Sequence, residues 1–319
     1  MNSTILSMIR RVQPIWLFVI VLLVFFGFMS EYFFTASNLF NILIQTSTIG
    51  LIALGMTYVM INGNIDLSVG AVVALSAVLA VDLQQYVGIP MAILIALATG
   101  TALGFLNGMI VWKTGVNAFI VTLGAMQGVR GLVFVYTEEQ SYFAMDFSYS
   151  DFGTSTFAGI PTLAIIFLGF ALLMHLILTR TVHGRDTYAV GSNIEAALDS
   201  GIRAGRHMVI NFMIVGFFAA LAGITLSMQM GAATPNLGRD YELWTITAVV
   251  LGGTKIAGGS GSIIGTLGGV LAIGILRNGM NLLQVPSFYV LVIMGTILIT
   301  VLMLDQYTTR SKAGREAAA

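Results

Sequence analysis

The residues that could do chemistry are few and scattered. Cysteine is absent, which excludes disulfides, thiolate metal sites and cysteine nucleophiles. The histidines His175, His183 and His207 form no HExxH metal site, and no GxSxG nucleophile motif occurs. The segment 253–260 comes nearest to a phosphate-binding loop, but no lysine follows its second glycine. We predict no catalytic residue, no metal site and no cofactor, and an integral enzyme with a scattered catalytic set remains an alternative.

One polar segment has the residues of a small docking element. Ser192 and Glu195 have the spacing of a capping box, in which the serine oxygen accepts from the Glu195 N–H. Gly201 then supplies a left-handed stop. A helix this short is not stable alone. It is either an ordinary capped loop helix or a surface helix to which another protein binds.

The elements around this segment belong in a membrane. The chain has 319 residues, of which 57% are hydrophobic and 9% charged, against about 25% charged in soluble domains. Mean hydropathy is +0.93. A spanning helix needs about 20 mostly apolar residues, and we predict an all-α integral membrane protein with about ten. The segments lie at about 12–30, 38–61, 67–86, 89–112, 117–136, 161–179, 207–231, 242–257, 261–283 and 286–304.

The charges predict which side of the membrane each loop occupies. Ten of the fourteen basic residues fall on one side, which the positive-inside rule makes cytoplasmic, together with both termini. They are Arg10, Arg11, Lys113, Arg180, Arg185, Arg203, Arg206, Arg310, Lys312 and Arg315. The run 15–29 is read as a retained first span, because no small-residue cleavage site follows it. We expect one transmembrane domain over 1–319, with a cytoplasmic loop at about 180–206, an external loop at about 137–160 and a frayed tail at 305–319. The zero net charge gives no indication of a nucleic-acid partner.

Ionisable side chains inside the predicted spans are few. Asp82, Arg130 and Arg277 lie towards the outer ends and His175 and Lys255 towards the inner ends. For most of them we expect snorkelling or structural pairing, and a functional role is the alternative. No acidic series crosses the bilayer centre, which weakens a proton-driven mechanism. The mid-membrane polar groups are mainly uncharged. Among them are Gln45, Asn107, Thr122, Gln127, Asn278 and Asn281. They either join helices or line a passage for a neutral hydroxylated solute.

Two further features concern the ends and the packing of the predicted spans. Asp66 precedes the third predicted span, where it is either the N-cap of that helix or a gating or contact residue. The chain has 36 glycines, many inside spans, which favours close helix packing. The glycines of 258–261 also predict a break at a tight cytoplasmic hairpin, where a partner could touch.

Four motifs, in order, resemble the membrane permease subunit of bacterial ABC importers for monosaccharides, the ribose, xylose, arabinose and galactoside group. The resemblance covers nearly the whole chain. The motifs lie at Ile65–Gly70, at Ala118–Gly124, at Tyr188–Gly191 continuing through Asn193, Glu195–Ala197 and Gly201–Ile202, and at Leu251–Thr254 continuing through Gly258–Gly259, Gly261–Ser262, Gly265–Thr266 and Asn278–Gly279.

The resemblance implies the ABC importer permease fold and a set of partners. These are an ATP-binding cassette subunit, a periplasmic sugar-binding protein, a second permease subunit that is identical or paralogous, and membrane lipid in the bacterial inner membrane. ATP is then bound by the partner subunit. The rivals are an ABC permease for a nucleoside, a sugar alcohol or a branched-chain amino acid, and a secondary transporter.

It also assigns residues to two roles. The predicted coupling helix for the ATP-binding subunit contains Gly191, Ser192, Asn193, Glu195, Ala196, Ala197 and Gly201. The motif in the fifth span adds Phe119 and supports Thr122 in the predicted substrate path, which comprises Gln45, Asn107, Phe119, Thr122, Gln127, Asn278 and Asn281.

Overall fold

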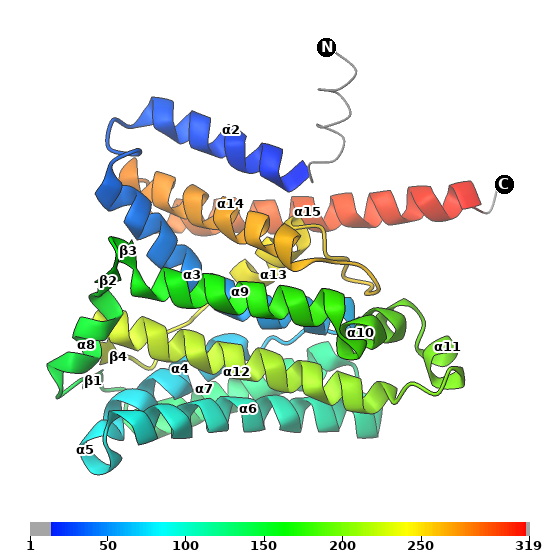
Figure 1. Cartoon of the computed structure of the whole chain (residues 1–319), viewed down its shortest axis with the longest axis horizontal. Helices are drawn as coiled ribbons and strands as arrows, with labels where there is room; N and C mark the ends of the chain where they lie inside the picture. Colours follow the sequence, from blue (N-terminus) through cyan, green and yellow to red (C-terminus); the bar gives the residue numbers. More distant parts are fainter. Residues whose placement is uncertain (1–13, 317–319) are drawn as a thin grey trace.

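The computed structural model describes the backbone of residues 14–316 and the side chains of residues 14–303, and Arg10 and Arg11 lie outside them. Long helices account for most of this part of the chain (Figure 1). They are α2 (Pro14–Met29), α3 (Ala36–Ile61), α4 (Val69–Asp82), α6 (Ile89–Thr114), α7 (Ala118–Thr137), α9 (Thr162–Arg180), α12 (Ala204–Met230), α13 (Tyr241–Leu251), α14 (Ile263–Leu282) and α15 (Ser287–Glu316).

Each predicted apolar segment is therefore helical, and the chain is a multi-pass membrane protein. Among the described residues, six helices are long and apolar enough to cross a membrane, namely α3, α6, α7, α9, α12 and α14. The helices α2, α4 and α13 and the stretch Ser287–Met303 of α15 are apolar but shorter. The segment predicted to reach residue 257 ends at Leu251, because Gly253 adopts a φ of +90° that does not continue a helix.

Glycines let the central helix approach its neighbours closely. Helix α12 packs on α3, α4 and α6. A Cβ at Gly104 of α6 would overlap the carbonyl group of Phe212 on α12, and one at Gly216 of α12 would overlap the carbonyl oxygen of Gly100. The interpretation of the glycines as close-packing positions is confirmed at this contact.

The segment 137–160 is ordered. It contains the helix α8 (Phe147–Thr154), and the Tyr149 hydroxyl lies 2.7 Å from the Ser227 hydroxyl on α12. Its short strands are β1 (Tyr142–Phe143), which pairs with β4 (Ala232–Ala233), and β2 (Thr156–Phe157), which pairs with β3 (Ile160–Pro161). The chain is thus mainly helical, and these two-residue strands close loops at one end of the bundle (Figure 1).

Two arginines of the predicted spans form structural contacts. The Arg130 guanidinium donates to the carbonyl oxygens of Pro235 and Leu237, both at 2.8 Å, and to that of Gly70 at 3.0 Å. The Arg277 guanidinium carbon lies 3.8 Å from the centre of the Trp244 ring, a cation–π contact. Of snorkelling and structural pairing, the two roles expected for these residues, structural pairing is the one that both arginines show.

At the C-terminal end, α15 continues to Glu316. The backbone of residues 305–316 is therefore helical, where a frayed tail is expected from the sequence. No proline interrupts this stretch, so nothing in its backbone chemistry stops the helix at the end of the apolar run.

Candidate functional site

The segment 180–206 folds into two short helices between α9 and α12, α10 (Val182–Ser192) and α11 (Ile194–Asp199). The predicted capping box at Ser192 is wrong. Ser192 is the last residue of α10, and the Asn193 side-chain oxygen accepts from the Ala196 N–H at 3.0 Å to cap α11. Asparagine and serine cap equally well. Which of the two residues caps α11 therefore depends on where α10 ends.

The predicted stop at Gly201 is confirmed. Its φ is +79°, in the region that favours glycine. The Gly201 N–H donates to the Leu198 carbonyl and the Ile202 N–H donates to the Ala197 carbonyl, the paired bonds of a Schellman motif. Both ends of α11 are thus fixed by local hydrogen bonds.

Helix α11 exposes two apolar side chains beside its carboxylates. Ile194 and Leu198, one helical turn apart, are 39% and 47% exposed. Ala197 instead is buried and packs with Val190 and Ala204. The sequence interpretation did not single out Ile194 and Leu198, although their i, i+4 spacing was a visible signal. The capped helix thus leaves two neighbouring apolar side chains exposed on its surface.

Helix α10 connects α11 to the spans. A Cβ at Gly191 would overlap the carbonyl oxygen of Ile61, the last residue of α3, so only glycine fits there. The Gly259 N–H donates to that same oxygen at 2.8 Å. The Tyr188 hydroxyl donates to the Gly261 carbonyl at 2.7 Å. The glycine-rich segment 252–262, non-helical as predicted at 258–261, therefore meets α10 and α3.

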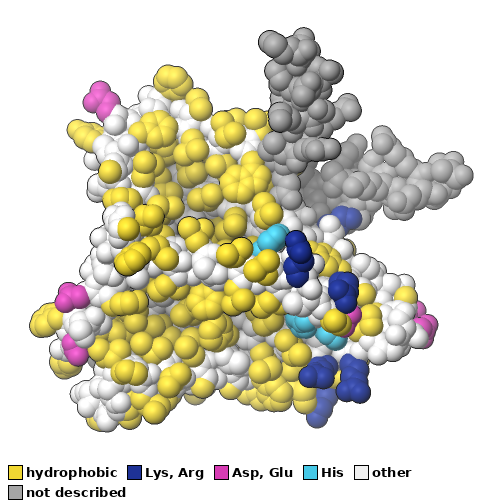
Figure 2. Space-filling model, in the orientation of Figure 1, with side chains coloured by type: hydrophobic (Ala, Val, Ile, Leu, Met, Phe, Trp, Pro, Cys, Tyr) yellow, Lys and Arg dark blue, Asp and Glu magenta, His cyan; other side chains and the backbone are white. Residues whose placement is uncertain are grey.

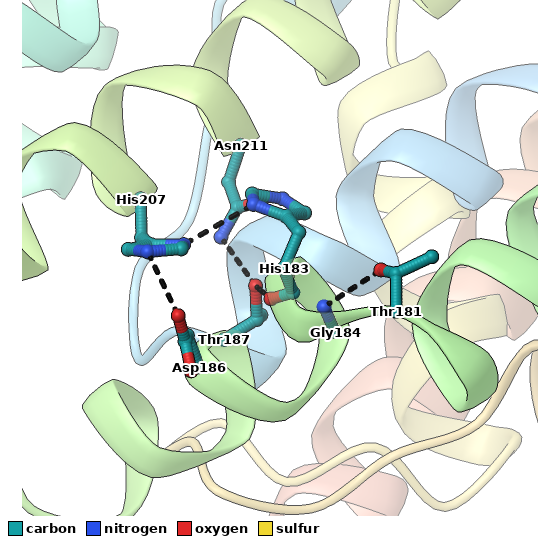
Figure 3. Close-up of polar contacts among 7 residues, drawn as sticks. All are labelled: Thr181, His183, Gly184, Asp186, Thr187, His207 and Asn211. Atoms are coloured by element: carbon teal, nitrogen blue, oxygen red, sulfur yellow. Dashed lines mark hydrogen bonds and ion pairs between the residues drawn. The ribbon is translucent and has the colours of Figure 1, made fainter. Parts of the chain in front are cut away.

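A polar cluster joins α10 to the first turns of α12 (Figure 3). His183 Nε2 lies 2.9 Å from Asn211 Oδ1, and its Nδ1 lies 3.1 Å from Nδ1 of His207. His207 Nε2 lies 3.2 Å from the Asp186 carboxylate. The Tyr58 ring of α3 stacks on His183. Burial lowers the pKa of His183, which favours the neutral imidazole. The cluster holds α10 on α12, a contact that sequence spacing does not reveal.

A cavity of about 500 Å³ opens beside α11. Ile194 of α11, Phe119 of α7 and Trp112 of α6 line it, together with Asn64 and Asn117. No residue in its lining is charged. Amide groups and aromatic rings are suited to an uncharged solute with both hydroxyl groups and an apolar face.

Two predicted path residues meet at the turn between α3 and α4. The Thr122 hydroxyl lies 3.4 Å from the Ile65 carbonyl oxygen. The Asn107 amide donates to the Ser68 hydroxyl at 3.0 Å. Both side chains are buried. Asn107 and Thr122 thus hold a turn whose residue Ile65 lines the cavity.

Asp66 lies in the same turn. Its Oδ1 accepts from the Ser68 N–H at 2.8 Å and from the Ser68 hydroxyl at 2.6 Å. The N-cap of α4 is Ser68, so the prediction that Asp66 is itself the cap is wrong by two positions. The carboxylate closes the turn that precedes the helix, because the buried Ser68 amide needs an acceptor there.

The remaining predicted path residues lie apart. Asn278 of α14 exchanges two amide hydrogen bonds with Asn38 of α3, at 2.8 and 3.0 Å. Gln127 and Asn281 are exposed, and Gln45 is half-buried. Phe119 is the one member of the predicted set in the lining of the cavity.

Comparison with known proteins identifies the class. The model of the family described as "Branched-chain amino acid transport system / permease component" matches residues 38–302. The chain belongs to this family of transport permeases. No solved structure matches the chain significantly.

Curated relatives are permeases for sugars. The chain is 41% identical to the ribose import permease protein RbsC of Bacillus subtilis (strain 168), over 91% of this chain and 90% of that protein. It is 36% identical to the D-allose transport system permease protein AlsC of Escherichia coli (strain K12), over 91% and 90%. It is also 36% identical to the L-arabinose ABC transporter permease protein AraH of Azospirillum brasilense, over 91% and 86%. The resemblance to monosaccharide importer permeases is confirmed.

Proposed function

We propose that this chain forms one half of the translocation path of an ATP-binding cassette importer for a neutral monosaccharide. Ribose, allose and arabinose are the sugars in the names of its relatives, which supports a five- or six-carbon sugar. The chain is a conduit that binds no cofactor, and a partner subunit hydrolyses ATP.

The observation that carries this proposal is the exposed apolar pair Ile194 and Leu198 on a helix fixed to the spans. The ATP-binding subunit docks on this face of α11. Gly191 and Tyr188 pass a displacement of α11 to the end of α3 and to the segment 252–262. The predicted coupling residues Gly191, Asn193, Ala197 and Gly201 shape this element, and Ile194 and Leu198 supply the contact.

The uncharged cavity supports the assignment of a sugar. Asn64 and Asn117 can exchange hydrogen bonds with hydroxyl groups, and Trp112 and Phe119 can pack on the apolar face of a sugar ring. Such contacts are weak enough to release the solute, which transport requires. Because Ile194 also lines this cavity, movement of α11 changes the cavity directly.

The remaining architecture follows the same proposal. The chain is a single transmembrane domain of about ten spans in the bacterial inner membrane, with both termini and α11 on the cytoplasmic side. A periplasmic binding protein delivers sugar to the opposite face. A second permease subunit, identical or paralogous, completes the path, and the two halves rock between outward and inward openings.

Reconstitution with an ATP-binding subunit and a sugar-binding protein in proteoliposomes tests the proposal. The wild-type chain is expected to take up ribose, allose or arabinose only with ATP. The double variant Ile194→Glu, Leu198→Glu is expected to insert normally, lose co-purification of the ATP-binding subunit and lose uptake. The conservative control Ile194→Val, Leu198→Ile keeps an apolar face and is expected to retain both.

Three outcomes would contradict it. Uptake without ATP would indicate a secondary transporter. Normal co-purification of the ATP-binding subunit with the glutamate variant would show that this subunit does not dock on Ile194 and Leu198. Uptake of a nucleoside, a sugar alcohol or a branched-chain amino acid, with no uptake of sugars, would support the role as an importer permease but contradict the monosaccharide substrate.

A further inference from the structure

A groove beside α12 has no role in the path proposed above. It begins in a cavity of about 510 Å³ between α6 and α12, with Lys113 and Arg206 at one end and apolar side chains such as Met109 and Met213 along it. Gly205 lets the Trp112 ring lie across the start of α12, because a Cβ there would overlap the ring. The groove is therefore basic at one end and apolar beyond it.

The groove continues between α12 and α9. A second cavity, of about 360 Å³, shares Ile210 and Met213 with the first, and apart from Thr101 its lining residues are apolar, Phe170 and Phe217 among them. A long apolar furrow thus runs along membrane-spanning helices from a basic end. In Figure 2 this face is covered with apolar side chains, and the basic groups gather at one edge of it.

The basic end has a surplus of positive charge. Arg203 and Arg206 line a third cavity with His207 and Asp186, which shares Arg206 and Ile210 with the groove. Asp186 contacts His207. Within the described part of the chain, Lys113, Arg203 and Arg206 form no ion pair or side-chain hydrogen bond, and all three are exposed.

We propose that the groove binds an anionic phospholipid. The phosphate of the headgroup lies between Lys113 and Arg206, and an acyl chain follows the furrow past Met213 to Phe170. Basic pockets between transmembrane helices attract anionic headgroups. A free phosphate ion would leave the apolar furrow unfilled. A zwitterionic lipid would bring its own ammonium group to an end that already has a surplus of positive charge, so an anionic lipid fits the whole groove.

The position of this site gives it a consequence. Arg206 belongs to the first turn of α12, and its neighbour His207 contacts His183 of α10. A lipid bound there fastens the beginning of α12 to the end of α6, next to the helix on which we place the ATP-binding subunit. Of the proposed function, the lipid inference requires only that the chain lies in a membrane. It does not depend on the identity of the transported substrate.

Native mass spectrometry of the purified full chain tests the site. Phosphatidylglycerol is expected to stay bound through delipidation more than phosphatidylethanolamine with the same acyl chains. The variant Lys113→Gln, Arg206→Gln is expected to retain on the order of thirtyfold less phosphatidylglycerol, since each of the two surface cations near an anionic lipid contributes about 1 kcal/mol. The matched variant Arg180→Gln, Arg185→Gln removes two exposed charges outside the groove lining and is expected to bind like the wild type.

A second variant separates lipid from free anion. Met213→Trp fills the furrow and leaves the charges, and it is expected to lower retention of phosphatidylglycerol. The proposal is overturned if both phospholipids are retained equally, if the two charge variants behave alike, if Met213→Trp binds as the wild type does, or if millimolar inorganic phosphate displaces the lipid completely.

Discussion

The Tyr188 hydroxyl of α10 donates a hydrogen bond to the carbonyl oxygen of Gly261, 73 residues further along the chain, at a distance of 2.7 Å. This bond joins α10 to the glycine-rich segment that leads into α14. Together with the contact of Gly191 on Ile61, it connects α11 to two separate parts of the bundle.

Removing that hydroxyl should weaken coupling without unfolding the chain. Tyr188→Phe leaves the Gly261 carbonyl without this donor, at a cost of about 1 kcal/mol. We expect normal membrane insertion, normal co-purification of the ATP-binding subunit and a several-fold lower ratio of sugar taken up to ATP hydrolysed. An unchanged ratio would show that the bond has no part in transmission.

A methyl group at Gly191 should be more damaging than one at Gly201. Gly191→Ala collides with the Ile61 carbonyl, and overpacking of this kind costs about 1–3 kcal/mol. Gly201→Ala meets open space and strains only its positive φ, at about 1 kcal/mol. The midpoint of thermal unfolding in detergent should fall further for Gly191→Ala. Gly169→Ala, in a helix with no atom near the added group, is the control and should change little.

Arg130 should be important for stability. Its guanidinium donates to three backbone carbonyl groups on other segments, and hydrogen bonds to charged groups each contribute about 1.5–3 kcal/mol. Arg130→Met keeps much of the apolar stem and leaves these acceptors without a donor. We expect a clearly lower unfolding midpoint than for Arg239→Met, a change in an arginine of the same end of the bundle. Equal midpoints would contradict the structural role.

Acid should loosen the contact between α10 and α12. Above its ordinary pKa of 6.5, His183 is neutral in the folded and unfolded states, so it adds no pH dependence there. Burial lowers the folded pKa, so as pH falls below 6.5 the unfolded chain takes up the proton first and stability declines. His183→Gln should reduce the loss of thermal stability between about pH 7.5 and pH 5.5. A loss identical to that of the wild type would assign the effect to other groups.

Local patterns were sufficient to predict the long helices and some of their interruptions. The apolar runs gave each long helix, and the glycines of 258–261 and Gly201 gave two breaks, because these depend on neighbours in sequence. The end of α13 at Leu251 was missed, since the apolar run continues to residue 257. The boundary between Ser192 and Asn193 could not be predicted. Serine and asparagine are both common N-cap residues, so the residue types do not decide between the two positions. In the structure, the close approach of Gly191 to Ile61, 130 residues earlier, coincides with the point where α10 ends.

Contacts between distant residues were likewise beyond prediction. No spacing rule places His183 beside His207, or Asn38 against Asn278, which lie on helices separated by most of the chain. The same limit applies to the substrate path. The sequence indicates which residues are polar and at membrane depth, and only packing separates Phe119 at the cavity from Asn278 between helices.

The contact of Gly191 with the end of α3 has a mechanical consequence. Because backbone meets backbone there, with no side chain between, no change of rotamer can absorb a small shift of α10. Force applied to α11 is therefore expected to move α10 and the end of α3 together, as one rigid body.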